Sequence, residues 1–153
     1  MEIVNIIEDN ILSSISEIVG VPTSQIIISR QYVDKDNCDA GDYYTVENNI
    51  SDTPFHNMVY AVWFMKPMPG CCGIVISTGV TVNYAFQKRG LGTILNKLRI
   101  TIAKDLGYGC MMCTDVTTNI AQSKILDKNG WSKLSSFINP RTNNVVNIHA
   151  INL

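Results

Sequence analysis

The chain of 153 residues lacks any uncharged apolar run of about 18 residues, the length a helix needs to cross a bilayer. Its first segment, MEIVNIIEDN, has no basic residue ahead of an apolar stretch, so the pattern of a secretory signal is absent too. Charged residues make up only 16 % of the chain and the formal net charge is -1, which argues against a nucleic-acid binder held by bulk positive charge. We therefore expect a cytoplasmic protein with no membrane partner and no nucleic-acid partner.

Histidine is scarce and cysteine is odd in number. The five cysteines have no framework spacing, which is typical of reduced thiols and not of a disulfide scaffold. Cys110 and Cys113 form a CMMC motif, but residues three apart in a strand point to opposite faces, so buried thiols are favoured over a zinc site or a redox pair, and no metal is expected. Either of the two histidines, His56 and His149, is a candidate general base, although a surface or hydrogen-bonded histidine is the favoured interpretation.

What the chain has is the composition and length of one globular domain, residues 1–153, with 46 % hydrophobic residues. Hydrophobic periodicity predicts helices over 3–19, 91–106 and 119–128, and strands over 25–33, 42–46, 57–65, 71–86, 110–116, 131–138 and 145–151. Gly79 interrupts one strand and indicates a bulge or a close backbone approach, whereas Asn119 with Gln122 predicts a helix cap. Trp63 and Trp131 are predicted core residues. This order predicts a mixed α/β (α+β) sheet with helices on its faces, in which strand 110–116 runs parallel to strand 71–86.

Acidic and basic residues are unevenly distributed along the chain. One segment is acidic, with Asp34, Asp36, Asp39, Asp42, Glu47 and Asp52 against Lys35; another is basic and free of acids, with Lys88, Arg89, Lys97, Arg99 and Lys104. Two interpretations stay open: these are two solvated faces, or the basic segment faces an anionic ligand and the acidic one a cationic ligand.

The segment VTVNYAFQKRGLGTILNKL, residues 80–98, carries the most chemical information. A strand leads into QKRGLG and a helix follows at once, which gathers free backbone N–H groups and a helix dipole at one point. Gly90 and Gly92 leave the backbone open to a ligand, and Lys88 and Arg89 add positive charge. The residues by themselves leave open a phosphate site and a plain tight turn, because neither GxxxxGK[ST] nor the third glycine of a dinucleotide fingerprint is present.

QKRGLG resembles the Q/R-x-x-G-x-G/A signature of the GCN5-related N-acetyltransferase (GNAT) superfamily. Its context is similar too: a hairpin and long strand before it, and a helix, a strand, a second helix, the NGW run at 129–131 and a final hairpin after it. This resemblance covers residues 57–153. It implies a mostly antiparallel twisted sheet with a splayed parallel strand pair at its centre. The family usually opens with a strand and two helices, whereas this chain is predicted to open with a helix and an acidic loop.

The resemblance implies that acetyl-CoA is the cosubstrate. The backbone of Lys88, Arg89, Gly90, Leu91, Gly92 and Thr93 would then hold its diphosphate, and Gln87 would orient the turn. The strand positions Val80, Thr81 and Val82 would pair with the amides of the pantetheine arm, and Asn119 would lie near that arm. The acyl group would pass directly to a primary amine of a small molecule or a protein.

Two positions depart from the family pattern. The tyrosine that many members use as an acid is Leu126 here, and the glutamate that some use as a base is Thr114. Three explanations stay open: water carries the protons and the thiolate leaves unaided; Tyr84, Ser123 or Asp115 substitutes; or the chain is a catalytically silent module that binds CoA or a protein partner. The catalytic residues are therefore unknown at this point, and a homodimer is plausible because strand edges in this fold often pair.

Overall fold

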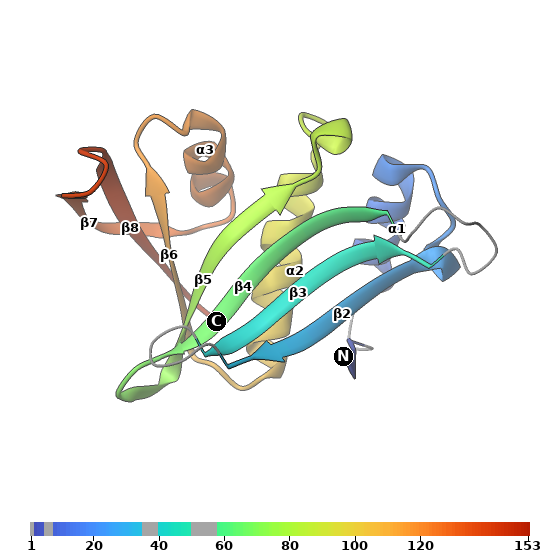
Figure 1. Cartoon of the computed structure of the whole chain (residues 1–153), viewed down its shortest axis with the longest axis horizontal. Coiled ribbons are helices and arrows are strands. Elements are labelled where there is room, and N and C mark those ends of the chain that lie inside the picture. Colours follow the sequence, from blue (N-terminus) through green and yellow to red (C-terminus); the bar gives the residue numbers. More distant parts are fainter. Residues whose placement is uncertain (1, 5–7, 35–39, 50–57) are drawn as a thin grey trace.

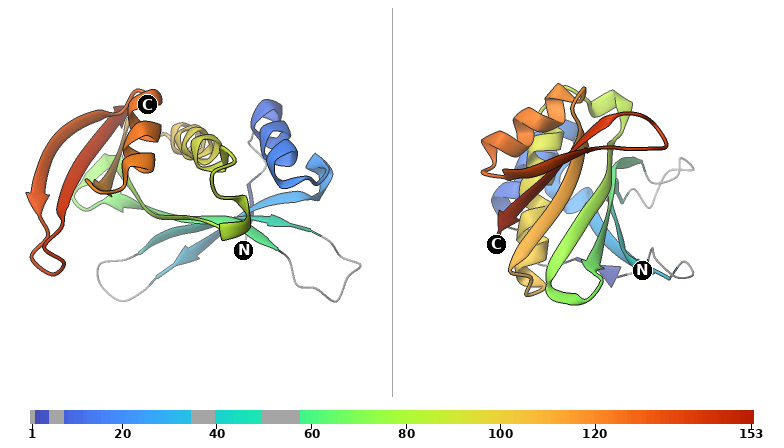
Figure 2. Two further views of the ribbon diagram at one scale, coloured as in Figure 1. Left: turned by 90° about the horizontal axis from the view of Figure 1, so that it is seen from above. Right: turned by 90° about the vertical axis from the view of Figure 1, so that its left-hand side faces the viewer.

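The computed structural model describes residues 2–4, 8–34, 40–49 and 58–153 (Figure 1). In these ranges the chain forms an eight-stranded sheet of order β1-β2-β3-β4-β5-β6-β8-β7. The strands are β1 (Glu2–Ile3), β2 (Ile26–Val33), β3 (Gly41–Asn48), β4 (Val59–Met68), β5 (Cys71–Val82), β6 (Cys110–Val116), β7 (Ser132–Ile138) and β8 (Val145–Asn152). The helices α1 (Asp9–Val19), α2 (Leu91–Asp105) and α3 (Ile120–Lys128) lie on one side of the sheet (Figure 2).

One strand pair of the sheet is parallel, and it is short. β5 and β6 pair only from Ile74 opposite Cys110 to Ile76 opposite Met112. The other neighbouring strands are antiparallel. Beyond the paired residues β5 and β6 diverge, as Figure 1 shows. The predicted mixed, mostly antiparallel sheet with a splayed parallel pair at its centre is confirmed.

The bulge predicted at Gly79 is also confirmed. Val62 of β4 lies opposite Thr81 and Phe64 lies opposite Thr78, so β5 has one extra residue in this stretch. Gly79 has φ +63°, a left-handed conformation that costs glycine little. The bulge bends β5 in the part of the strand that has already left β6.

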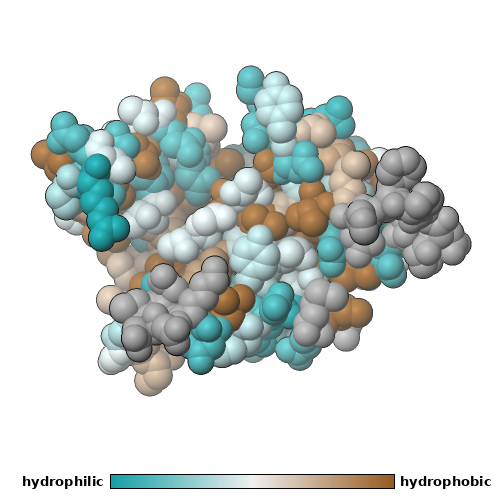
Figure 3. Space-filling model, viewed as in Figure 1, coloured by the Kyte–Doolittle hydropathy of each residue, from teal (hydrophilic) through white to brown (hydrophobic). Residues whose placement is uncertain are grey.

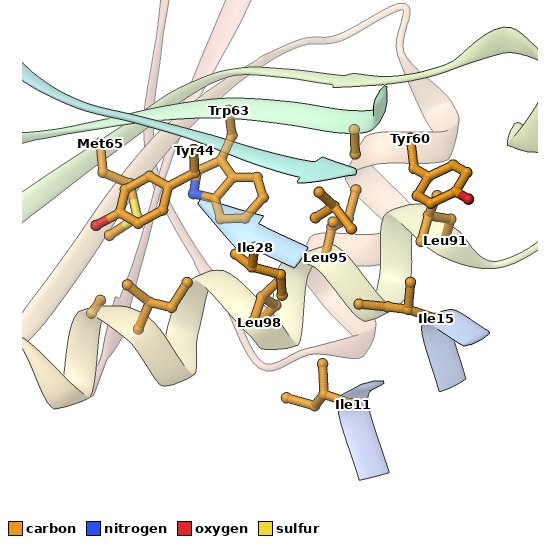
Figure 4. Close-up of a cluster of buried hydrophobic side chains, with 14 of the residues drawn as sticks. Ile11, Ile15, Ile28, Tyr44, Tyr60, Trp63, Met65, Leu91, Leu95 and Leu98 are labelled. Atoms are coloured by element: carbon orange, nitrogen blue, oxygen red, sulfur yellow. The ribbon is translucent and has the colours of Figure 1, made fainter. Parts of the chain in front are cut away.

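The core lies between the sheet and the helices α1 and α2. Its centre is a stacked aromatic pair, Tyr44 on β3 and Trp63 on β4, with ring centroids 5.1 Å apart and both side chains fully buried. Leu95 and Leu98 of α2 and the residues Ile11 and Ile15 of α1 belong to the same cluster, which includes the pair (Figure 4). Burying such side chains stabilises the fold by about 1.5–3 kcal/mol each. Trp131 is 5 % exposed, so both tryptophans are core residues as predicted.

The first predicted helix is wrong at its start. Glu2 and Ile3 form the edge strand β1, which pairs with Arg30 and Ser29 of β2, and α1 begins only at Asp9. The helical spacing of the isoleucines therefore extends ahead of the real helix, to Ile3 in a strand. There the backbone N–H and C=O groups are satisfied by pairing with β2 and not by a helix. Ile6 and Ile7 lie outside the described residues. The chain thus opens with a strand, as the GNAT resemblance would have it.

The acidic segment is only in part a loop. Asp42 lies in β3, an eight-residue strand that is longer than the predicted 42–46, and Arg30 binds its carboxylate with Nε 2.9 Å from Oδ1 and Nη2 2.9 Å from Oδ2. Ser29 donates a hydrogen bond to Glu47. Asp36, Asp39 and Asp52 lie outside the described residues, as does His56. The idea of a free acidic cluster that faces a cation therefore fails at Asp42, which is already ion-paired.

The remaining predicted elements agree with the structure within a few residues. β4 runs to Met68, where the predicted strand ended at residue 65. β5 ends at Val82, ahead of a short 3-10 turn, η2 (Tyr84–Phe86), where the predicted strand ran to residue 86. No helix among the described residues is long and apolar enough to span a bilayer.

Two glycines of the sheet give a matched test of this packing. A Cβ at Gly41 would lie 2.6 Å from the backbone oxygen of Met65, whereas a Cβ at Gly73 would meet nothing within 4 Å. We expect Gly41→Ala to lower the free energy of unfolding by about 1–3 kcal/mol through overpacking, and Gly73→Ala to change it by less than about 0.5 kcal/mol. Urea unfolding measures both, and equal effects would contradict the β3–β4 register.

Candidate active site at the split in the sheet

The QKRGLG run forms a tight turn between η2 and α2. Lys88 has φ +62° and Gly90 has φ +93°, so two left-handed residues flank Arg89. A left-handed lysine is uncommon, and such residues cluster at functional sites. The alternation turns successive backbone N–H groups toward one side, which is the geometry of an anion-binding nest.

The same turn starts α2, with Gly90 as its N-cap. The amide of Thr93 bonds to the Gly90 carbonyl at 3.0 Å, and those of Leu91 and Gly92 belong to the first turn, where amides have no acceptor within the helix. They lie at the positive end of the helix dipole, beside the exposed side chains of Lys88 and Arg89. The turn can therefore hold an anionic group such as a phosphate by backbone donors, dipole and charge together.

Several contacts fix this turn to the sheet. Gln87 donates its Nε2 to the Val82 carbonyl at 3.0 Å, which ties the turn to the end of β5. The Arg89 guanidinium lies 5.9 Å from the ring centroid of Phe86, and Phe86 packs edge-on against Tyr60 of β4. The hydrogen bond to Val82 is a contact through which Gln87 can orient the turn, the role expected of it.

Below the turn, one edge of β5 is open. Parallel pairing with β6 stops at Ile76, so Val80, Thr81 and Val82 have no β6 partner, while Thr81 and Val82 remain paired with β4 on the other side. Figure 3 shows the opening as a notch in the upper outline of the molecule, between the part that includes α3 and the part that includes the turn before α2. An extended ligand can add to this edge through main-chain hydrogen bonds.

The far side of the notch begins with α3. Asn119 is its N-cap, and its side chain accepts a hydrogen bond from the backbone N–H of Gln122 at 3.2 Å, as predicted. Leu126 is fully buried, so this residue belongs to the core. Thr114 is exposed on β6. Neither position places an acid or a base in the notch.

Asp115, Ser123 and His149 come together on this side. Ser123 Oγ donates to Asp115 Oδ2, and His149 Nε2 lies 2.9 Å from Asp115 Oδ1. Asp115 is 5 % exposed and His149 is 3 % exposed, while Ser123 is half-buried. His149 is therefore a hydrogen-bonded histidine, as the sequence interpretation favoured. No local pattern pointed to its partner, because Asp115 and His149 are 34 positions apart and meet only through the β6–β8 register.

Burial alone would raise the pKa of Asp115. Hydrogen bonds from Ser123, His149 and Asn147 outweigh that effect and hold the pKa below its ordinary value of 3.8. Asp115 is thus a buried carboxylate that stays ionised at neutral pH. Tyr84, the other candidate acid, is 89 % exposed in η2, on the opposite side of the notch.

Two surface hollows lie away from this notch. One of about 300 Å³ is lined by Arg30, Tyr44 and Ile102 among others, near the far end of α2, and one of about 400 Å³ lies between α1 and α2. No group of three or more potential metal ligands occurs among the described residues.

Comparison with known proteins relates the fold to a known architecture. No protein-family model and no curated protein sequence matches the chain. Solved structures do match. A GNAT family acetyltransferase from Elizabethkingia anophelis with acetyl-CoA bound has a TM-score of 0.66 at 14 % identity, over 84 % of this chain and 99 % of that one. The fold is that of the GNAT acetyltransferases.

Two further GNAT-fold structures match to the same extent. An acetyltransferase from Bacillus subtilis in complex with CoA has a TM-score of 0.64, at 14 % identity over 84 % of this chain and 99 % of that chain. An IAA acetyltransferase from Bacillus cereus has a TM-score of 0.63, with the same identity and coverage. At this identity the likeness shows the GNAT fold alone, and the chemistry has to be argued from the residues of this chain.

The buried carboxylate gives a pH-dependent prediction. The low folded-state pKa of Asp115 makes its stabilisation complete above the unfolded pKa of about 4 and lost as the pH falls through the folded pKa. We expect Asp115→Asn to lower the free energy of unfolding by about 2–3 kcal/mol at pH 7, because the buried donors lose their charged acceptor. Urea unfolding should show this deficit narrowing below about pH 4.

The exposed Asp127 of α3 supplies the matched control. Asp127→Asn should change the free energy of unfolding by less than about 0.5 kcal/mol at either pH. A deficit of Asp115→Asn that is the same at pH 7 and pH 3 would contradict the role given to the charge of Asp115.

Proposed function

We propose that this chain is an N-acetyltransferase that moves an acetyl group from acetyl-CoA directly to a primary amine of a small molecule or a protein. One observation carries the proposal: the nest around Lys88 and Gly90, at the N-terminus of α2, stands at the open end of an unpaired β5 edge. A molecule with a diphosphate and an amide-bearing arm matches both features at once.

The residues present fit this cosubstrate. The backbone of Lys88, Arg89, Gly90, Leu91, Gly92 and Thr93 would hold the diphosphate, and Val80, Thr81 and Val82 would pair with the arm. A Cβ at Gly92 would come 3.2 Å from Ile125, so glycine also keeps α3 close to the turn. Asn119 would lie near the arm from the α3 side. Two of the similar structures, named above as complexes with CoA or acetyl-CoA, support this assignment.

Acetyl-CoA supplies an activated thioester, and the chain has to bind it, admit an amine and manage protons. Leu126 is buried and Thr114 is not an acid or a base, so neither moves a proton. Among the substitutes, Ser123 is the best placed, because its hydroxyl is held by the ionised Asp115 at the start of α3. We assign it an orienting role toward the arm or the amine, with water as the carrier of the proton that the amine loses.

A second candidate function is a catalytically silent GNAT-fold module that binds CoA or a protein partner. The missing acid at Leu126 favours it, whereas the strained Lys88 in the turn favours a working ligand site. A homodimer is also part of the proposal. All seven residues of the outer strand β7 are exposed, including Leu134 and Ile138, and an edge of this kind can pair with a second copy.

Thermal unfolding with acetyl-CoA tests the binding site. At about 100 times its Kd the ligand should add about 2.7 kcal/mol, which raises the Tm of a domain of this size by roughly 5–10 °C. Lys88→Glu should weaken binding about tenfold, because it places a negative charge beside the nest. Lys104→Glu, at an exposed position in the last turn of α2, is the matched control and should leave the rise in Tm intact. No rise in the folded wild type would contradict the site.

Release of free CoA tests catalysis. We expect purified protein to release CoA from acetyl-CoA in the presence of a panel of primary amines, and mass spectrometry to find one acetyl group on the amine. N,N-dimethylated versions of the same amines should not react, because a tertiary amine has no proton to lose after attack. Binding without release for every small amine and for protein N-termini and lysines would favour the silent module.

A further inference from the structure

Of the two interpretations left open for the basic segment, the solvated face is wrong for Arg99, which is buried. The side chain is 1 % exposed, and Nη1 donates a hydrogen bond to Ser77 Oγ of β5 at 2.9 Å. Within the described part of the chain, its Nε is fully buried and has no hydrogen-bond partner. One turn earlier on α2, Asn96 is also fully buried; its Oδ1 accepts from Trp131 Nε1 at 3.1 Å, while its Nδ2 has no partner.

The charge of Arg99 is not neutralised nearby. No ion pair in the described part of the chain involves it, and Cys113 is the titratable group that interacts with it. Burial lowers the pKa of Arg99 to about 10, so the guanidinium is still charged at neutral pH. Burial also raises the pKa of Cys113 to about 12, which keeps this thiol neutral. Asp115, two residues further along β6, is held by Ser123 and His149.

The position of this charge in the fold is specific. Ile76 and Met112 are the last paired residues of β5 and β6, and Ser77 and Cys113 are the next residue on each strand. The guanidinium, bonded to Ser77 and acting on Cys113, therefore lies beneath the closed end of the split. The anion-binding turn stands at the open end. An arm that starts at the turn and follows the free edge of β5 points toward Arg99.

We propose that Arg99 is the electrostatic residue that stabilises the thiolate of coenzyme A as it leaves, in place of the proton donor that Leu126 cannot supply. This inference rests on the proposed function. An uncompensated charge buried in a protein is costly, and it acts on a nearby developing charge far more strongly than it would in water. A fixed cation of this kind requires no reorganisation at the moment of reaction.

The reaction step balances without a general acid. The lone pair of the amine nitrogen forms a bond to the carbonyl carbon, and the C–S bond breaks with its electron pair remaining on sulfur. The extra proton on nitrogen passes to water. The products are the N-acetyl amine, one proton and the CoA thiolate, and the positive field of Arg99 lowers the free energy of that thiolate.

The test is the pKa of the thiol of bound coenzyme A, which needs no acceptor amine. The thiolate absorbance of protein saturated with CoA is followed against pH, and the same titration with desulfo-CoA is subtracted to remove the five protein thiols. We expect the bound thiol to titrate at least one pKa unit below free CoA, a tenfold larger thiolate fraction under the same conditions.

Three variants separate charge from packing. Arg99→Met should raise the pKa of the bound thiol to that of free CoA or above, and Arg99→Lys should keep most of the lowering. Lys97→Met removes one charge from the exposed side of the same helix and should change nothing. Circular dichroism and thermal unfolding show whether each variant is folded. The titration of the wild type tests the inference even if a variant does not fold.

The inference is overturned if the bound thiol in the wild type titrates like free CoA. It is also overturned if the Arg99→Met protein binds CoA and keeps the lowered pKa of the thiol. Failure of the wild type to bind either CoA or desulfo-CoA overturns the proposed function itself, and this inference with it. A lowered pKa that is lost in Arg99→Met and kept in Arg99→Lys supports it.

Discussion

Pairing between β5 and β6 stops after three residues on each strand, and the rest of the site depends on this interruption. A strand that leaves its neighbour exposes unpaired backbone N–H and C=O groups, which have to find water or another partner. Here β5 carries a bulge at Gly79 beyond the paired residues, and the chain turns at 87–90 into α2. The split thus brings together an open edge of β5 and the N-terminus of α2 at the wide end of the opening.

Charged groups of opposite sign are buried near the two strands that part. Asp115 on β6 lies on the side of α3 and is stabilised by a shell of donors from Ser123, His149 and Asn147. Arg99 lies beneath the closed end, with a single hydrogen bond to Ser77 and no carboxylate partner in the described chain. A buried carboxylate whose hydrogen bonds are made can stabilise the fold. A buried cation without a counter-charge costs free energy, so its presence calls for a functional reason.

The fold and the chemistry are separable in this chain. The match to GNAT-fold structures spans 84 % of this chain and 99 % of theirs at only 14 % identity, so the architecture is kept although most side chains differ. Leu126 and Thr114, where this chain departs from the sequence pattern of the superfamily, are a core side chain and an exposed side chain. The chemistry proposed for this chain therefore rests on its own residues, with the buried Arg99 in place of a proton donor.

Local signals in the sequence determined most of the fold and the place of the QKRGLG turn. The QKRGLG run, the cap at Asn119 and the bulge at Gly79 are each specified by a few neighbouring residues, since turn and cap preferences act over a single turn of chain. The start of α1 was missed because pairing of Glu2 and Ile3 with β2 overrode a helical pattern. Only the tertiary structure decided the roles of Arg99 and Asp115. Arg99 follows Leu95 and precedes Ile102 on one helix face, a spacing that could have signalled its burial, but its partner Ser77 and the contact of Asp115 with His149 depend on strand register, which local sequence does not encode.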